Sequence, residues 1–170
     1  SSTYSSTTRI CKWDRDDGTM VGSCSTAGRY GTALAIYEGA DELFLLQTSS
    51  SSSYRKIVGF STSNLATNGK SISYGSGVSS WYYSQDIDVD ESTGDVYIVY
   101  REYQGRLRAY ERGTDGSYCA SSSCYTQVYT GARYSTSVDV HEDYVYTAGY
   151  YYSSWYGGMK KMPTSSLSSI

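Results

Sequence analysis

The sequence predicts an all-β protein built from three repeats of about 50 residues, each forming a small antiparallel sheet. The first indication lies near the middle of the chain, where Ile87 and Val89 alternate with acidic residues, as in a strand with one buried face. A Ser-Thr-Gly-Asp turn at 92–95 separates this strand from a nearly all apolar strand at 96–100, which an alternating strand at 106–110 follows. Three short strands in succession predict an antiparallel meander.

The same pattern occurs twice more. Leu34 precedes Ile87 by 53 residues (87 − 34), and Val138 follows Ile87 by 51 (138 − 87). A tyrosine stands four residues before each of these positions: Tyr30, Tyr83 and Tyr134. Strand-only repeats of this length are typical of a β-propeller or a similar array. We expect a single domain over residues 1–170, with four-stranded repeats that start near residues 32, 85 and 136.

The strands follow in order along the chain. Segments 9–13 and 20–24 resemble the two outer strands of a repeat whose inner strands are missing, so strands 9–24 are expected to complete a seam blade. The first complete repeat has expected strands at 31–38, 42–47, 54–60 and 70–74. The second repeat ends with a strand near 124–129, and the third contains a strand at 159–162.

Three repeats are too few to close a propeller, which typically has four to eight blades. We therefore expect two chains to form one six-bladed ring, in which the N-terminal strands of each chain complete the last blade of the other. The strand count leaves one alternative open. Both 9–13 and 159–162 match a third strand, so one of them is either an added edge strand or a tail outside the sheet.

Composition excludes some classes of partner. The net charge of −3 gives no basic patch for nucleic acid or an anionic membrane. No segment approaches the roughly 20 apolar residues that a membrane-spanning helix needs. The 21 tyrosines favour strands and tolerate partial exposure, because the ring packs while the hydroxyl stays hydrated. We expect no nucleic-acid or membrane partner and no cofactor.

The four cysteines form two sequence-local pairs, Cys11 with Cys24 and Cys119 with Cys124. Four cysteines allow three pairings, and local pairing is the expectation because each pair would brace an outer hairpin of a repeat. Their spacing, with one histidine in the chain, does not match a zinc site. Disulfides predict a secreted protein.

Candidate binding residues lie in loops that a propeller would place on one face. Sugars present a flat C–H face to aromatic rings and hydroxyls to polar groups, so aromatic-plus-polar loops suit carbohydrate. Repetition adds multivalency. The expected ligand-binding residues are Arg29, Tyr30, Trp81, Tyr83, Tyr103, Arg133, Tyr134 and Trp155. The alternative is that the repeated tyrosines are wedges buried between blades for packing alone.

Acidic and catalytic patterns are weak. Asp88, Asp90 and Asp139 lie on the polar faces of the inner strands, where they would be hydrated or bond neighbouring backbone. The acidic turn at 14–18 lacks the closing glutamate of a calcium loop and predicts a solvated hairpin. His141 is the only histidine and has no triad or metal pattern around it, so we expect a non-enzyme.

In its tyrosine-rich, all-β repeats with local cysteine pairs, the chain resembles the small β-propeller lectins of the tachylectin-2-like kind and the small secreted lectins of sponges. The resemblance covers residues 9–162 and is one of overall character rather than of a motif. It implies binding of N-acetylated hexosamines, such as N-acetylglucosamine or N-acetylgalactosamine, at sites between or atop blades and without a cofactor.

Three functional hypotheses follow. The first is a multivalent, homodimeric or higher even-numbered lectin. The second is an extracellular scaffold or adhesive that binds protein partners through its tyrosine-rich surface. The third is a glycan-cleaving propeller, since paired carboxylates occur in any acidic chain.

Overall fold

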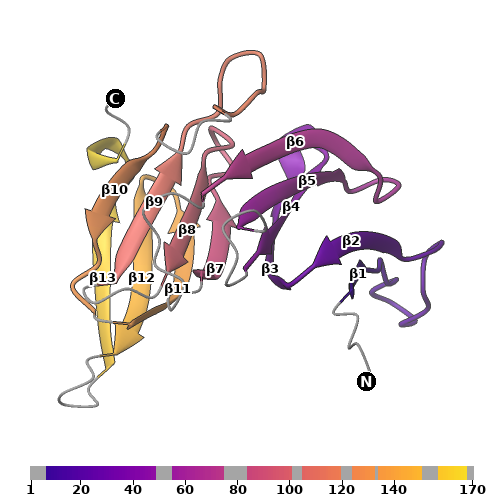
Figure 1. Cartoon of the computed structure of the whole chain (residues 1–170), viewed down its shortest axis with the longest axis horizontal. Coiled ribbons are helices and arrows are strands. Elements are labelled where there is room, and N and C mark those ends of the chain that lie inside the picture. The colour runs from indigo at the N-terminus through magenta and orange to yellow at the C-terminus, as the bar shows by residue number, and fades with distance from the viewer. Residues whose placement is uncertain are drawn as a thin grey trace, which may run out of the picture.

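A computed structural model describes residues 7–48, 55–74, 84–100, 105–119, 124–132, 134–150 and 157–167. It omits the side chains of residues 29, 84 and 85. Figure 1 shows four antiparallel sheets that follow one another across the molecule, with β1 and β13 at opposite ends. The described residues form strands and two short 3₁₀ turns, η1 (Glu38–Ala40) and η3 (Thr164–Ser166). The all-β prediction is confirmed. No helix in the described ranges has the length and apolar character to cross a membrane.

The strands of the described residues make up four sheets. Sheet A contains β1 (Thr7–Ile10) and β2 (Ser25–Arg29). Sheet B contains β3 (Gly31–Tyr37), β4 (Glu42–Gln47), β5 (Lys56–Ser61) and β6 (Thr67–Ser73). Sheet C contains β7 (Ser84–Val89), β8 (Val96–Tyr100), β9 (Arg106–Tyr110) and β10 (Thr126–Tyr129). Sheet D contains β11 (Tyr134–His141), β12 (Tyr144–Tyr150) and β13 (Gly157–Pro163).

Sheets B, C and D are meanders, because each strand pairs with the next one along the chain. The predicted turn between β7 and β8 is present. The Asp90 N–H donates to the Asp95 carbonyl at 3.0 Å, and the Gly94 N–H donates to the Asp90 carbonyl at 2.7 Å. Gly94 has φ +80°, a conformation that glycine adopts at little cost.

Three apolar layers hold the sheets face to face. Sheet B packs on sheet C through side chains that include Phe44, Leu46, Ile87 and Ile98. Sheet C packs on sheet D through Tyr97, Val99, Leu107, Val138 and Val145, among others. Sheet A covers part of the other face of sheet B, where Ile10 and Ala27 contact Leu43, Leu45 and Phe60. Each fully buried Leu, Ile or Phe contributes about 1.5–3 kcal/mol of stabilisation.

The first strands of sheets B, C and D lie side by side, β3 next to β7 and β7 next to β11. Between β7 and β11, two carboxylates make the connection. Asp86 accepts the backbone N–H of Val138 at 3.1 Å, and Asp88 accepts that of Val140 at 2.6 Å. Of the two expectations for Asp88, bonding to neighbouring backbone is the one observed. Burial raises the pKa of Asp88, and the Val140 N–H opposes that rise.

The sheets of one chain form an open series. Among the described residues, sheets A and D lie at its two ends, and their strands do not close a ring within one chain.

The N-terminal strands differ from the prediction. They are Thr7–Ile10 and Ser25–Arg29 rather than 9–13 and 20–24. The hairpin between them keeps part of the expected pairing, an isolated Trp13–Met20 bridge and the Val21 N–H that donates to the Lys12 carbonyl at 2.8 Å. The Asp14 and Asp17 carboxylates accept the N–H groups of Asp16 and Thr19, both at 2.8 Å, and stabilise the turn of this hairpin. This loop is the solvated hairpin expected for residues 14–18.

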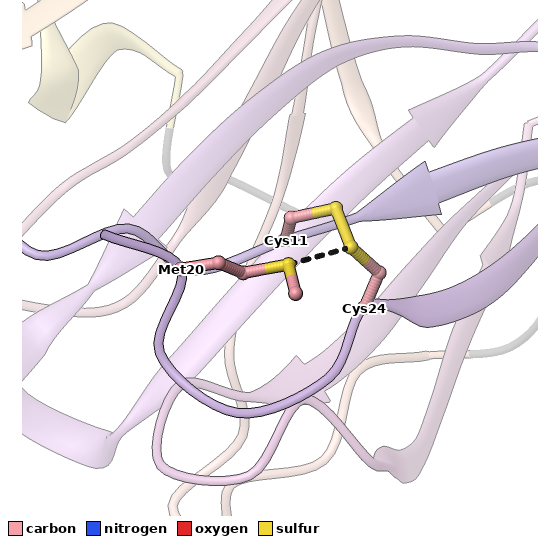
Figure 2. The surroundings of a disulfide bond; sticks show 3 residues. All are labelled: Cys11, Met20 and Cys24. Carbon is pink, nitrogen blue, oxygen red and sulfur yellow. Dashed lines mark hydrogen bonds between the residues drawn. A yellow bond between two sulfur atoms is a disulfide. The ribbon is translucent and has the colours of Figure 1, made fainter. Parts of the chain in front are cut away.

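Both predicted disulfides are present, Cys11–Cys24 and Cys119–Cys124. The first closes the N-terminal hairpin at its base. Figure 2 shows the Met20 side chain directed at this disulfide, with its Sδ 3.5 Å from Cys24 Sγ. Because Cys24 carries no thiol proton in the disulfide, this is a packing contact between sulfur atoms.

The C-terminal segment is a strand. β13 pairs with β12 along its whole length, from Tyr150↔Gly157 to Tyr144↔Pro163. The alternative that 159–162 is a tail outside the sheet is therefore wrong. β1 is a strand as well, paired with β2, so the chain carries both strands that the sequence placed third in a blade.

Candidate binding surface

The strand register brings the predicted loops to one side of each sheet. In sheet B, Gly31 pairs with Gln47, and Gln47 pairs with Lys56. The beginning of β3, the end of β4 and the beginning of β5 therefore lie together, and the same holds for the equivalent strands of sheets C and D. We call the side on which β3, β7 and β11 begin the loop face.

The structure describes only some of the predicted binding residues. Trp81, Tyr83, Tyr103, Arg133 and Trp155 lie outside the described residues. Arg29 ends β2, and its side chain is not described. Tyr30 and Tyr134, which the repeat makes equivalent, are both described, and they differ.

Tyr30 is exposed on the loop face. It joins β2 to β3, its side chain is 42% exposed, and its φ is +61°, a left-handed conformation that is rare for a tyrosine. Neighbouring strands hold the backbone there. The Thr48 N–H donates to the Tyr30 carbonyl at 2.9 Å, and the Gly31 N–H donates to Thr8 Oγ1 at 2.8 Å. Such strain costs about 1–3 kcal/mol, and it is found most often at functional sites.

Tyr134 is buried at 8% exposure. Its ring centroid lies 4.9 Å from that of Tyr150, its partner across β11 and β12. The packing alternative therefore describes Tyr134, although its aromatic partner belongs to the same sheet rather than to a neighbouring one. By the register of the repeats, Thr48 in sheet B takes the place of Tyr150, which explains why the two tyrosines differ.

A groove opens between sheets A and B, and Gly28, two residues before Tyr30, is part of its lining. It encloses about 410 Å³. Its lining combines polar groups with apolar carbon, from Thr26, Gly28, Gln47, Lys56, Val58 and Thr67, among others. The Gln47 side chain is fixed, because its Nε2 donates to the Ala27 carbonyl. Gly28 has φ +79°, and a β-carbon at this position would lie 3.1 Å from Gln47 Nε2.

A second exposed tyrosine on the loop face was not predicted. Tyr129 ends β10 with half of its surface exposed, and the Arg106 guanidinium lies 5.0 Å from its ring centroid. Lys160 Nζ donates to the Tyr129 carbonyl at 2.7 Å. The pairing of β10 with β9 brings Arg106 to Tyr129, and Lys160 comes from β13 of sheet D, so no local sequence pattern predicts them.

A buried arginine fixes sheet C to the end of sheet B. Arg108 is 1% exposed, and its guanidinium lies 3.9 Å from the Tyr125 ring centroid and 4.9 Å from that of Tyr100. Its Nη1 donates to the Tyr74 carbonyl at 3.0 Å, and its Nε donates to Gln127 Oε1 at 3.0 Å. Burial raises the pKa of the Tyr100 hydroxyl, and the Arg108 charge opposes that rise. This cluster is structural, because its groups are occupied with one another.

The opposite side of the sheets carries an ion cluster. The buried Glu42 carboxylate binds Lys70 Nζ, and Arg112 Nη2 lies 3.7 Å from the same oxygen. No group of three or more potential metal ligands occurs in the described ranges. His141 lies at the exposed end of β11, with its Nε2 3.9 Å from the Glu142 carboxylate.

No known family model matches this chain, and no curated protein matches it either. A function for the chain must therefore be argued from its own residues.

Proposed function

We propose that this chain is a secreted, multivalent carbohydrate-binding protein that binds glycans on its loop face. The observation that carries the proposal is Tyr30, an exposed aromatic side chain on a strained backbone, two residues after Gly28 in the lining of a mixed polar and apolar groove. The groove has the size of a small-molecule site.

The chemistry of the groove suits a sugar. A tyrosine ring stacks on the C–H face of a pyranose, while threonine hydroxyls and the Lys56 ammonium group suit its hydroxyls. N-acetylated hexosamines are the first candidates, following the lectin resemblance. The two disulfides are consistent with an extracellular protein.

The proposed architecture is a β-propeller of three blades per chain, closed as a six-bladed ring by two chains. Three features support it: consecutive meander sheets, face-to-face packing, and first strands that lie side by side. A ring would place several copies of the loop face in one plane and so provide multivalency.

The test measures glycan binding by calorimetry with N-acetylglucosamine and N-acetylgalactosamine oligosaccharides. The sharpest variant is Tyr30→Gly, because glycine relieves the left-handed strain while removing the ring. We expect equal or higher stability and about a tenfold or greater loss of affinity, the effect of removing a contact worth about 1.4 kcal/mol. Trp13→Ala removes an exposed aromatic ring of the N-terminal hairpin and should leave affinity unchanged. Unchanged affinity in Tyr30→Gly would exclude this site.

One observation favours the second hypothesis, an extracellular scaffold that binds protein partners. The disulfide-braced hairpin exposes Trp13, Met20 and Val21, each with at least two fifths of its surface accessible (Figure 2 shows Met20). Exposed apolar groups on a rigid hairpin are typical of protein contact sites. On this hypothesis, simple sugars do not inhibit binding to cells or matrix, and Trp13→Ser abolishes that binding.

A further inference from the structure

The two ends of the sheet series expose complementary parts of one repeated contact. In the inner strands, Ile87 and Val89 pack on the preceding sheet B, and Val138 and Val140 pack on the preceding sheet C. Leu34 and Ile36 hold the same positions in β3, yet they are 49% and 50% exposed. Two apolar side chains that the other repeats bury are thus open on sheet B.

Sheet A explains why only these two remain open. β1 and β2 cover the outer part of this face, where Ile10 packs against Leu45. In the proposed propeller they are the outer strands of a blade, and the described chain leaves the place of its inner strands open. A hollow of about 300 Å³ between β1 and β3 includes Leu34 in its lining.

Sheet D exposes the opposite half of the contact. Asp139 holds in β11 the position that Asp88 holds in β7, where Asp88 accepts the Val140 N–H at 2.6 Å. Asp139 faces outward and is exposed. The surrounding face has a hollow of about 340 Å³ lined by Tyr146, Ala148 and Met159, and Met159 is 82% exposed. By the strand register these three residues replace Tyr97, Val99 and Leu107, which sheet C buries against sheet D.

We propose that sheet D of one copy docks head to tail on Leu34 and Ile36 of a second copy, with Asp139 accepting the backbone N–H of the second copy's Ile36. A second copy is the expected occupant, because the contact continues the one that already joins sheets C and D. A second copy presents the face that the repeat places before sheet B. When each of two chains makes this contact with the other, the two chains form a closed ring. A head-to-tail contact that does not close in this way would add further chains without limit. The inference rests on the propeller architecture proposed above, but not on glycan binding.

The test is the solution mass of the whole chain by light scattering across a range of concentrations. We expect two chain masses for the wild type and one for Ile36→Lys, because a lysine here loses its hydration on docking. Since Ile36 is half exposed, the variant should fold, which circular dichroism checks. Tyr129→Lys is the matched control, an equally exposed residue at the end of β10 in sheet C, away from both ends of the series, and it should remain a dimer.

A mixture of two variants tests the pairing itself. Asp139→Lys should also be monomeric, and mixing it with Ile36→Lys restores one intact interface, so dimer should reappear at the higher concentrations. A monomeric wild type, an unrestricted ladder of larger species, or no recovery on mixing would overturn the proposal. Glycan calorimetry on Ile36→Lys tests glycan binding separately from dimer formation. A loss of glycan affinity in Tyr30→Gly refutes neither the docking proposal nor the lectin function. A wild-type dimer that binds no glycan refutes the lectin function only.

Discussion

Gly105→Ala tests how closely sheet C approaches the segment that leads into sheet D. Gly105 precedes β9 with φ +55°, and its carbonyl accepts the Thr130 N–H at 3.1 Å. A β-carbon at this position would lie 1.9 Å from the Ala132 carbonyl oxygen. Alanine in a left-handed conformation costs about 1–2 kcal/mol. The overlap is with backbone, which no rotamer change relieves, so overpacking adds about 1–3 kcal/mol. The expected loss in the free energy of unfolding is about 2–5 kcal/mol.

Gly69→Ala separates the two contributions. Gly69 has φ +80°, but a β-carbon added there would have no other atom within 4 Å, so its alanine variant carries the conformational cost alone. Urea unfolding followed by circular dichroism, with disulfides intact, gives both values. We expect Gly105→Ala to lose about 1–3 kcal/mol more than Gly69→Ala. Equal losses would show that the close approach of Gly105 to Ala132 is wrong.

Three further predictions use urea unfolding, two of them across a pH series. Burial raises the pKa of Asp88, so the folded protein holds this proton more tightly than the unfolded chain. The stability of the wild type relative to Asp88→Asn should therefore fall as the pH rises from about 4 to the folded pKa, and a rise would contradict the assignment. Asp41 should show the opposite pH dependence of stability, because the hydrogen bond from the Thr62 hydroxyl lowers its pKa. The advantage of the wild type over Asp41→Asn should be present at pH 7 and shrink as the pH falls below about 4. Arg108→Lys loses the planar donors to Tyr74 and Gln127 and should cost about 2–3 kcal/mol, whereas a neutral result would remove its role in joining sheets B and C.

Local chemistry determined most of what the sequence predicted. Alternation at Ile87 and Val89, together with the turn at Gly94, specifies a strand and a hairpin through contacts between near neighbours. The cysteine pairs were predictable for the same reason, since each joins the two ends of a short segment. The N-terminal strand bounds were wrong because the regular strands, Thr7–Ile10 and Ser25–Arg29, pair on the far side of the Cys11–Cys24 disulfide, while an isolated Trp13–Met20 bridge remains in the hairpin.

The tertiary structure decided which of the equivalent residues are buried. Tyr30 and Tyr134 occupy the same place in the repeat, but the neighbouring strand supplies Thr48 to the first and Tyr150 to the second. Repeat position also failed to show that Leu34 is open while Ile87 is covered. A strand pattern states which face of a strand is apolar, whereas burial depends on whether another sheet lies opposite that face, and this depends on residues far away in the chain or in a second copy.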